Sequence, residues 1–130
     1  MKPRRLEKLK SFLKERVAKI ILLELKDPRI GFVTVLDVDV TKDGRYADIS
    51  VSILGEDVQK RKAMRALEDS AGFISCEVAK DLDIRTTPKC RFHLDETVEK
   101  QIRLEKLIEN AIADTRRNEE MRQENQNPEP

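Results

Sequence analysis

Few side chains in this 130-residue sequence could carry out catalysis. Proton and acyl transfer need converging groups, such as a histidine that lies beside a nucleophile or an acid. The single histidine, His93, alternates outward on a short predicted strand, with no evident nucleophile or acid beside it. A Walker loop is absent, as are the patterns GxGxxG, GxSxG and HExxH. We therefore predict that the protein is not an enzyme, with no catalytic residue and no small-molecule substrate.

Residue types that bind metals are present but poorly arranged. Cys76 and Cys90 lie far apart without a CxxC or HxH pattern, and we interpret them as buried, reduced thiols. Four aspartates gather around a predicted hairpin and could suggest a cation: Asp37, Asp39, Asp43 and Asp48. The strand spacing places Asp37 and Asp39 on the solvent side, where a hydrated acidic face is the favoured interpretation. No metal and no other cofactor is predicted.

Lysine and arginine side chains offer the clearest chemistry, because they neutralise phosphates and release counterions. The formal net charge is only +1, but residues 1–29 hold ten Lys or Arg against four Asp or Glu. Residues 30–57 hold two against six, and such asymmetry can orient a protein on a polyanion. The foremost candidates for phosphate contacts lie at the start of the first predicted helix: Lys2, Arg4, Arg5, Lys8 and Lys10.

These cations oppose the helix dipole, which favours acids at a helix start. Two interpretations stay open: an external anion, or a solvated face that keeps the protein soluble. Second-rank candidates follow later in the chain: Lys60, Arg61, Lys80, Arg85, Lys89 and Arg91. Aromatic residues make up only 4% of the chain, which argues against base stacking on a sheet. A reader of the shape and backbone of structured RNA fits better.

An amphipathic pattern predicts the first helix over residues 4–25. It is expected to end at Asp27-Pro28-Arg29, because proline pushes the residue before it out of the α region. Arg29 could anchor this loop or touch a partner, and both roles stay open. The apolar stripe of the helix consists of Leu6, Leu9, Leu13, Val17, Ile20 or Ile21, and Leu25.

The next segment predicts a β-hairpin over residues 33–54. Val33 and Val35 are out of phase with Val38 and Val40, so a β-bulge near Leu36-Asp37 is needed to bring all four to one face. Asp43-Gly44 is the usual signal of a two-residue turn. Residues 46–54 alternate apolar and polar side chains, which is typical of a half-buried strand with one wet face.

A long helix is predicted over residues 58–82, with Asp57 as its N-cap. Gly72 lies near its middle, and a glycine in a helix interior costs ~1 kcal/mol relative to alanine. Either the helix kinks there, or something packs or binds closely against the bare backbone. The sequence leaves both explanations open.

The rest of the chain predicts a short strand over residues 90–94 and a helix over residues 99–118. Residues 116–130 lack an apolar stripe, so we expect one domain over residues 1–115 and a flexible polar tail over residues 116–130. The first ten residues show no apolar signal region, and no apolar run approaches the ~18 residues of a membrane span. A cytoplasmic protein without a membrane partner is expected.

The resulting order is helix, strand, strand, helix, strand, helix, an α+β arrangement with one polar sheet face. It is similar to a type II KH domain, whose RNA site is a GxxG loop between two helices. This chain has no GxxG, and Ser70-Ala71-Gly72 lies inside the long helical pattern instead. That feature resembles the ribosome-binding factor A family of bacterial small-subunit maturation factors, in which an Ala-x-Gly kink replaces the GxxG loop.

The motifs that carry the resemblance extend over residues 4–112. They include the leucine-rich first helix with its Asp-Pro-Arg end, the strand pair, and the runs Gly72-Phe73-Ile74 and Pro88 to Phe92. Two positions depart from the family: Ser70 stands where alanine is usual, and Asp43-Gly44 where Asp-Leu is frequent. Serine can bond back to a helix and favour a bend, so we expect the kink to persist.

The resemblance implies a type II KH-like fold with a kinked long helix, an extra C-terminal helix and a three-stranded sheet covered by helices on one face. It implies a non-enzymatic assembly factor that binds the free or immature 30S subunit through 16S rRNA. Such a factor assists late maturation and rRNA processing, and matters most in the cold. Ser70, Ala71 and Gly72 would present backbone to the RNA, and the free protein would be a monomer.

A competing hypothesis of another class stays open beside it. The protein could be an interaction module that docks a protein partner through the exposed sheet face or the acidic tail.

Overall fold

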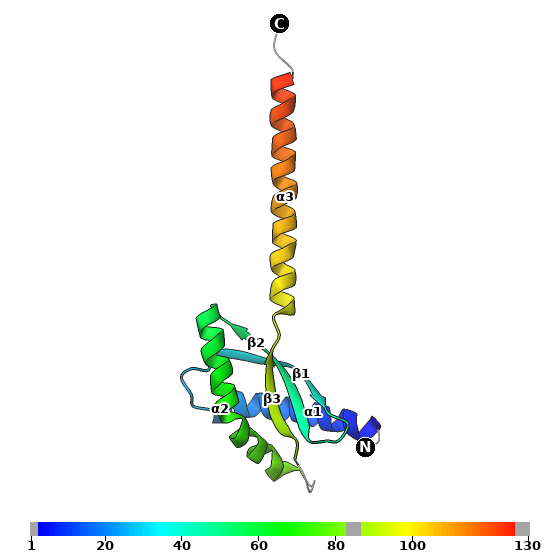
Figure 1. The fold of residues 1–130 in the computed structure, drawn as a ribbon, viewed down its shortest axis with the longest axis vertical. Coiled ribbons are helices and arrows are strands. Elements are labelled where there is room, and N and C mark those ends of the chain that lie inside the picture. Colours follow the sequence, from blue (N-terminus) through cyan, green and yellow to red (C-terminus); the bar gives the residue numbers. More distant parts are fainter. Residues whose placement is uncertain (1–2, 83–86, 127–130) are drawn as a thin grey trace. The chain divides into compact units, whose positions relative to one another are not determined.

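A three-stranded sheet lies at the centre of the first of two compact units, Met1–Asp95 and Glu96–Pro130. The computed structural model describes residues 3–82 and 87–126. In the first unit the elements are α1 (Pro3–Lys19), a π-helical turn η1 (Ile20–Glu24), β1 (Phe32–Val40), β2 (Tyr46–Leu54), α2 (Asp57–Asp81) and β3 (Lys89–Leu94). The second unit contains α3 (Thr97–Gln126), and Figure 1 labels each helix and strand.

The sheet has the order β1-β2-β3, with β1 antiparallel to β2 and β2 parallel to β3. The register of β1 on β2 shifts between Val35 and Asp37, so Leu36 is the extra residue of a β-bulge. This confirms the predicted bulge. Beyond it, Val38 and Val40 are buried on the same face as the apolar residues of β2.

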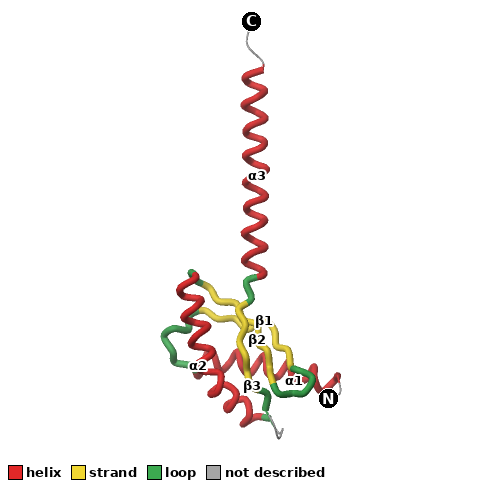
Figure 2. Tube along the Cα trace, viewed as in Figure 1, coloured by secondary structure: helices red, strands yellow, loops and turns green. Residues whose placement is uncertain are grey.

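One face of the sheet forms the core of this unit. Side chains of α1, η1 and α2 pack onto it, and Figure 2 shows α1 and α2 in red beside the yellow strands. The opposite face carries polar and charged side chains, as the alternation along β2 predicted. The buried cluster includes Leu13, Val17 and Ile20 from the first helical segment, Ile49, Val51 and Ile53 from β2, Leu67, Ile74 and Val78 from α2, and Phe92 from β3.

The first helix ends differently from the prediction. Regular α-helix stops at Lys19, and a π-helical turn carries the chain to Glu24, where the Leu25 N–H donates to the Ile20 carbonyl at 3.0 Å. A π-turn accommodates one more residue than an α-turn. Ile20 and Ile21 are therefore both buried, whereas the periodic pattern allowed only one of them in the stripe.

The hairpin loop is wider than the predicted two-residue turn. The Thr41 N–H donates to the Tyr46 carbonyl at 3.0 Å, so residues 42–45 form a four-residue loop. The Asp43 carboxylate accepts hydrogen bonds from the Thr41 hydroxyl at 2.6 Å and from the Arg45 N–H at 3.1 Å. Gly44 adopts the left-handed conformation with φ 72°, which favours glycine. The Asp-Gly pair thus marks the hairpin, but through an aspartate-stabilised loop.

Helix α2 begins one residue before the predicted start. Glu56 is its N-cap and forms a capping box with Gln59, whose side chain accepts from the Glu56 N–H at 2.9 Å. Asp57, the predicted N-cap, is the first helical residue. Figure 1 shows α2 changing direction along its length, in agreement with the predicted kinked helix.

A serine side chain joins α2 to the outer edge of β3. The Ser75 hydroxyl donates to the Ala71 carbonyl at 2.8 Å and accepts from the Cys90 N–H at 3.1 Å. Ser75, rather than Ser70, therefore makes a side-chain bond back to the helix, and no hydrogen bond of the Ser70 side chain is described. Of the two predicted buried thiols, only Cys90 is buried, and burial raises its pKa, while Cys76 is exposed.

The second unit consists mainly of α3. This helix continues to Gln126, eight residues beyond the predicted end at residue 118, because its charged and polar residues favour helix even without an apolar stripe. Its large apolar residues between Val98 and Ile112 are at least half exposed. That residues 116–130 form a separate flexible tail stays a prediction.

We predict that Ser75→Ala destabilises the fold by ~1–3 kcal/mol, because the Cys90 N–H at the sheet edge loses its acceptor. Urea denaturation of both proteins measures the difference. Ser70→Ala is the matched control, since it removes the same atom from the same helix without a described hydrogen bond, and little change is expected. Equal losses in the two variants would contradict the assignment of this bond.

Candidate nucleic-acid interface

Gly72 lies on the exposed side of α2, in the interior of the helix. A Cβ atom added at this position would meet nothing within 4 Å, so no described part of the chain packs against the glycine. Its φ is not positive either, because the positive-φ glycines of the described residues are Gly44 and Gly55. Internal packing and backbone strain therefore do not explain the glycine. The explanations that remain are flexibility at the bend and close approach of an external molecule.

The residues beside Gly72 form a small mixed surface. Ser70 and Ala71 are half-buried, and Phe73 is 46% exposed. The sequence reasoning did not single out Phe73 as a site residue, although it falls outside the apolar stripe of α2. An exposed aromatic ring next to an open backbone can stack against a nucleobase.

Arg29 is paired with two acids of the same chain, and its side chain is 37% exposed. Its Nε and Nη2 donate to the Asp27 carboxylate at 3.0 and 2.7 Å, and its Nη1 donates to Asp69 at 3.1 Å. These two acids raise the pKa of Arg29, while Arg29 lowers the pKa of Asp27. Of the two predicted roles for Arg29, the structure supports the loop anchor.

The predicted phosphate contacts at the start of α1 have different surroundings. Arg4, Arg5 and Lys8 are exposed, and no described acid forms an ion pair with them. Lys10 is half-buried, with Nζ at 3.2 Å from Asp39, and this acid raises its pKa. Lys2 lies outside the described residues. Three cations without a described acidic partner therefore gather within two turns of one helix.

Some of the second-rank candidates are exposed cations, and others are buried or paired with an acid of the same chain. Arg61 and Lys89 are exposed, whereas Lys60 is buried with 6% exposure and Lys80 pairs with Glu77 at 2.7 Å. Arg85 lies outside the described residues. Burial removes Lys60 from the surface that a phosphate could reach, so the structure does not bring all the predicted cations onto one face.

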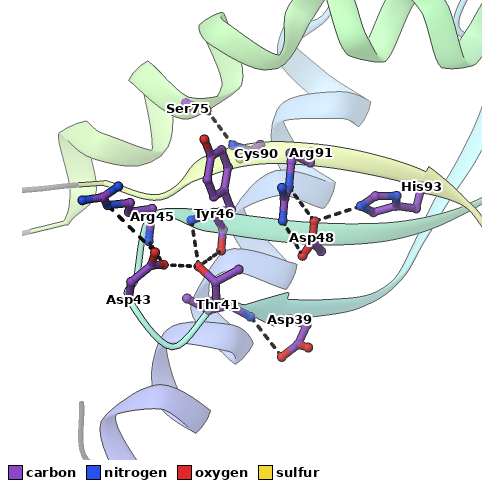
Figure 3. Close-up of polar contacts among 11 residues, drawn as sticks. Asp39, Thr41, Asp43, Arg45, Tyr46, Asp48, Ser75, Cys90, Arg91 and His93 are labelled. Carbon is purple, nitrogen blue, oxygen red and sulfur yellow. Dashed lines mark hydrogen bonds and ion pairs between the residues drawn. The ribbon is translucent and has the colours of Figure 1, made fainter.

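Arg91 belongs to a polar cluster on the open face of the sheet (Figure 3). Its Nε and Nη2 donate to the Asp48 carboxylate at 2.8 and 2.9 Å, and its guanidinium lies 4.1 Å from the centroid of the Tyr46 ring. His93 Nε2 also lies 2.9 Å from Asp48, so an acid does stand beside the histidine, contrary to the prediction. Arg91 and then His93 lower the pKa of Asp48.

This cluster lacks the features of a catalytic site. Ser50 is the cross-strand neighbour of His93, but no described hydrogen bond joins their side chains, and no described hollow is lined by them. Within residues 3–82 and 87–126, no group of three or more His, Cys, Asp or Glu could hold a metal ion. None of the helices described here is long and apolar enough to cross a membrane.

An exposed apolar patch was missed by the sequence reasoning. Phe32 and Leu54 face each other across β1 and β2, and the two residues are 78% and 73% exposed. They line a hollow of about 480 Å³ together with Gly31, Gln59 and Lys62. The sequence did contain a signal for this patch. Leu54 lies at one of the alternate positions of β2 that otherwise carry polar side chains.

Comparison with known proteins decides the family. A sequence profile described as Ribosome-binding factor A matches residues 5–108. The chain belongs to the ribosome-binding factor A family. Ribosome-binding factor A of Dictyoglomus thermophilum is 42% identical over 112 residues, which cover 85% of this chain and 93% of the relative.

Solved structures of the family share the fold described above. The crystal structure of ribosome-binding factor A from Thermus thermophilus superposes with a TM-score of 0.62 at 28% identity, covering 68% of this chain and 93% of that one. A homology model of the Thermus thermophilus factor, fitted into a cryo-EM map of its complex with the 30S subunit, gives a TM-score of 0.57 at 28% identity and covers 68% of this chain and 92% of that one. The family profile ends within α3, so the C-terminal part of this helix lies outside the shared region.

We predict that Gly72→Ala stabilises the folded protein by up to ~1 kcal/mol, since alanine favours helix and the added methyl group meets open space. Thermal or urea unfolding measures this change. Gly44→Ala provides the contrast, because the left-handed conformation at φ 72° disfavours alanine and the variant should lose stability. A destabilised Gly72→Ala protein would show that the bend itself requires glycine.

Proposed function

We propose that this protein is a non-enzymatic assembly factor that binds the free or immature 30S subunit through 16S rRNA. It would assist late small-subunit maturation and rRNA processing, in the cytoplasm and without a cofactor. Membership of the ribosome-binding factor A family carries this proposal, together with the relative that was fitted into a 30S complex. The exposed cations of α1 provide the chemistry that RNA binding needs.

The proposed RNA surface has two parts. Arg4, Arg5 and Lys8 hold phosphates, assisted by Lys2 and Lys10, while Ser70, Ala71 and Gly72 allow the sugar-phosphate backbone to approach α2 closely. Arg61, Arg85 and Lys89 are secondary phosphate contacts. Lys60, Lys80 and Arg91 contribute less, because the first is buried and the other two are paired with Glu77 and Asp48.

Such a factor needs no chemical step. A protein that binds one RNA conformer more tightly than another shifts the equilibrium by the difference in binding free energy. RNA duplexes are over-stabilised in the cold, so a bias of this kind would matter most at low temperature. Free in solution, the factor would act as a monomer.

The proposal predicts that the triple variant Arg4→Ala, Arg5→Ala, Lys8→Ala loses at least about tenfold affinity for 30S particles in ~100 mM salt. Each lost phosphate contact reduces the slope of log affinity against log salt by ~0.7–0.9, so three contacts reduce it by ~2–3. Co-sedimentation of purified 30S particles with each variant, over a range of salt concentrations, measures both quantities.

The control removes three exposed cations from α3 instead: Arg103→Ala, Lys106→Ala and Arg116→Ala. For this control variant, the slope of log affinity against log salt should stay at the wild-type value. If the wild-type protein does not associate with 30S particles even at low salt, or if both triple variants lose the same affinity, the proposed RNA surface is wrong.

A second function is favoured by the exposed apolar patch. Phe32 and Leu54 lie at one end of the open sheet face, beside the hollow described above, and such patches mark protein interaction sites. The alternative is therefore a module that docks a protein partner through this face. The acidic tail, the other surface considered, gains no comparable support.

The double variant Phe32→Gln, Leu54→Gln separates the two functions. If the patch docks a ribosomal protein, the variant binds intact 30S particles more weakly but binds protein-free 16S rRNA as the wild type does. Val98→Gln, Ile102→Gln on α3 is the control for lost apolar surface. Unchanged binding of the patch variant to both targets would eliminate this second function.

A further inference from the structure

Two arginines that the RNA surface does not use lie on either side of Gly72. Arg29 pairs with Asp69, three residues before Gly72, and Arg16 pairs with Glu77 and Asp81, which follow it. Both arginines come from segments outside α2. Each half of the helix is therefore tied separately to the N-terminal part of the chain.

The ion pair before Gly72 is formed by Arg29, in the loop that follows η1. Arg29 is fixed by the Asp27 side chain, which also accepts the Arg29 backbone N–H at 2.9 Å. From this rigid turn the Nη1 group reaches Asp69 at 3.1 Å. A guanidinium that is held by two carboxylates in one geometry restricts the position of both partners.

The ion pairs after Gly72 are formed by Arg16 of α1. The Nε group of Arg16 donates to Asp81 at 2.7 Å, while Nη1 lies 3.3 Å from Glu24 and Nη2 lies 3.9 Å from Glu77. The Arg16 and Glu77 side chains are about one-fifth exposed, so they are shielded more than ordinary surface pairs. Asp81 is the last residue of α2, so this tie reaches the helix end.

The surface of α2 is open at Gly72, between these two sets of ion pairs. Gly72 has no side chain, and a Cβ atom added there would meet nothing within 4 Å beyond the helix's own backbone. Buried Leu67 and Ile74 hold the core side of the helix. Ion pairs of Arg29 and Arg16 also cross from other segments to α2, in addition to the hydrogen bond that joins Ser75 to β3.

We propose that Arg29 and Arg16 are positioning residues that fix the two halves of α2 relative to each other and so preorganise Ser70–Gly72 for the RNA backbone. This inference rests on the proposed RNA-binding function. Direct phosphate contact by either arginine is disfavoured, because each is surrounded by at least two carboxylates that would repel a phosphate. Their effect on RNA is exerted through the shape of α2.

The decisive experiment removes an acid. Simple electrostatics predicts that Asp69→Asn binds RNA more tightly, since a negative charge disappears from the surface. The positioning role predicts the opposite, a loss of roughly fivefold in affinity for 30S particles, the lower end of the coupling between linked sites. Glu68→Gln is the matched control, an exposed acid one residue earlier without a described ion pair, and it should bind as tightly as the wild type or more tightly.

The salt dependence and a conservative substitution identify how Arg29 acts. Arg29→Lys keeps the charge but cannot hold Asp27 and Asp69 together, so the positioning role predicts the same loss as Asp69→Asn with an unchanged salt slope. A direct phosphate contact predicts little loss for Arg29→Lys, and for Arg29→Gln a slope smaller by ~0.7–0.9. The double variant Arg29→Gln, Asp69→Asn should be no weaker than either single variant.

Hydrogen exchange of the free protein tests the ties without RNA. Asp69→Asn and Asp81→Asn should each speed exchange of the amides over residues 68–76, while the buried amides of β2 keep their wild-type rates. If exchange accelerates but no variant of the set binds 30S particles differently, the ties exist and the RNA-binding surface is misplaced. Unchanged exchange, or tighter RNA binding by Asp69→Asn, would overturn the positioning role itself.

Discussion

The structure depends on one helix that packs against a sheet on both sides of a glycine. Leu67 before Gly72 and Ile74 and Val78 after it are fully buried against the apolar face of the strands. A connection between the parallel strands β2 and β3 requires a crossover, and α2 provides it. Because both halves of α2 are held by buried side chains, the helix continues through Gly72 without ending there. The same packing leaves the glycine backbone at the surface.

In this fold some cationic side chains form ion pairs with carboxylates of the same chain, and another group is exposed. Arg16, Arg29 and Arg91 each meet at least one carboxylate from a distant part of the chain. Arg4, Arg5 and Lys8 have no such partner among the described residues. A net charge of +1 therefore coexists with a locally cationic helix start, which is the feature that RNA binding requires. Composition alone understated this asymmetry, because several arginines are paired with carboxylates of the same chain.

Local patterns predicted the fold well where one element decides its own structure. The phase change between Val35 and Val38 predicted the β-bulge, and the alternation of residues 46–54 predicted which face of β2 is wet. Predictions were wrong where the same residues fit two different local structures. Ile20 and Ile21 could not both join an α-helical stripe, and a π-turn accommodates both of them. The Asp-Gly pair fits a two-residue turn, but the side-chain bonds of Asp43 favour a longer loop.

The sequence by itself determined the order of elements, the position of the awkward glycine and the family resemblance, because these depend on periodicity and on motifs that are contiguous in the chain. Only the tertiary structure decided which charges are paired internally. Arg29 and Asp69 are 40 residues apart, Arg91 and Asp48 are 43 apart, and Arg16 and Asp81 are 65 apart. No spacing rule relates such pairs, since they meet only when α1, the sheet and α2 have packed. The candidate cations could therefore be named from the sequence, but the distinction between an exposed cation and one paired within the chain required the folded structure.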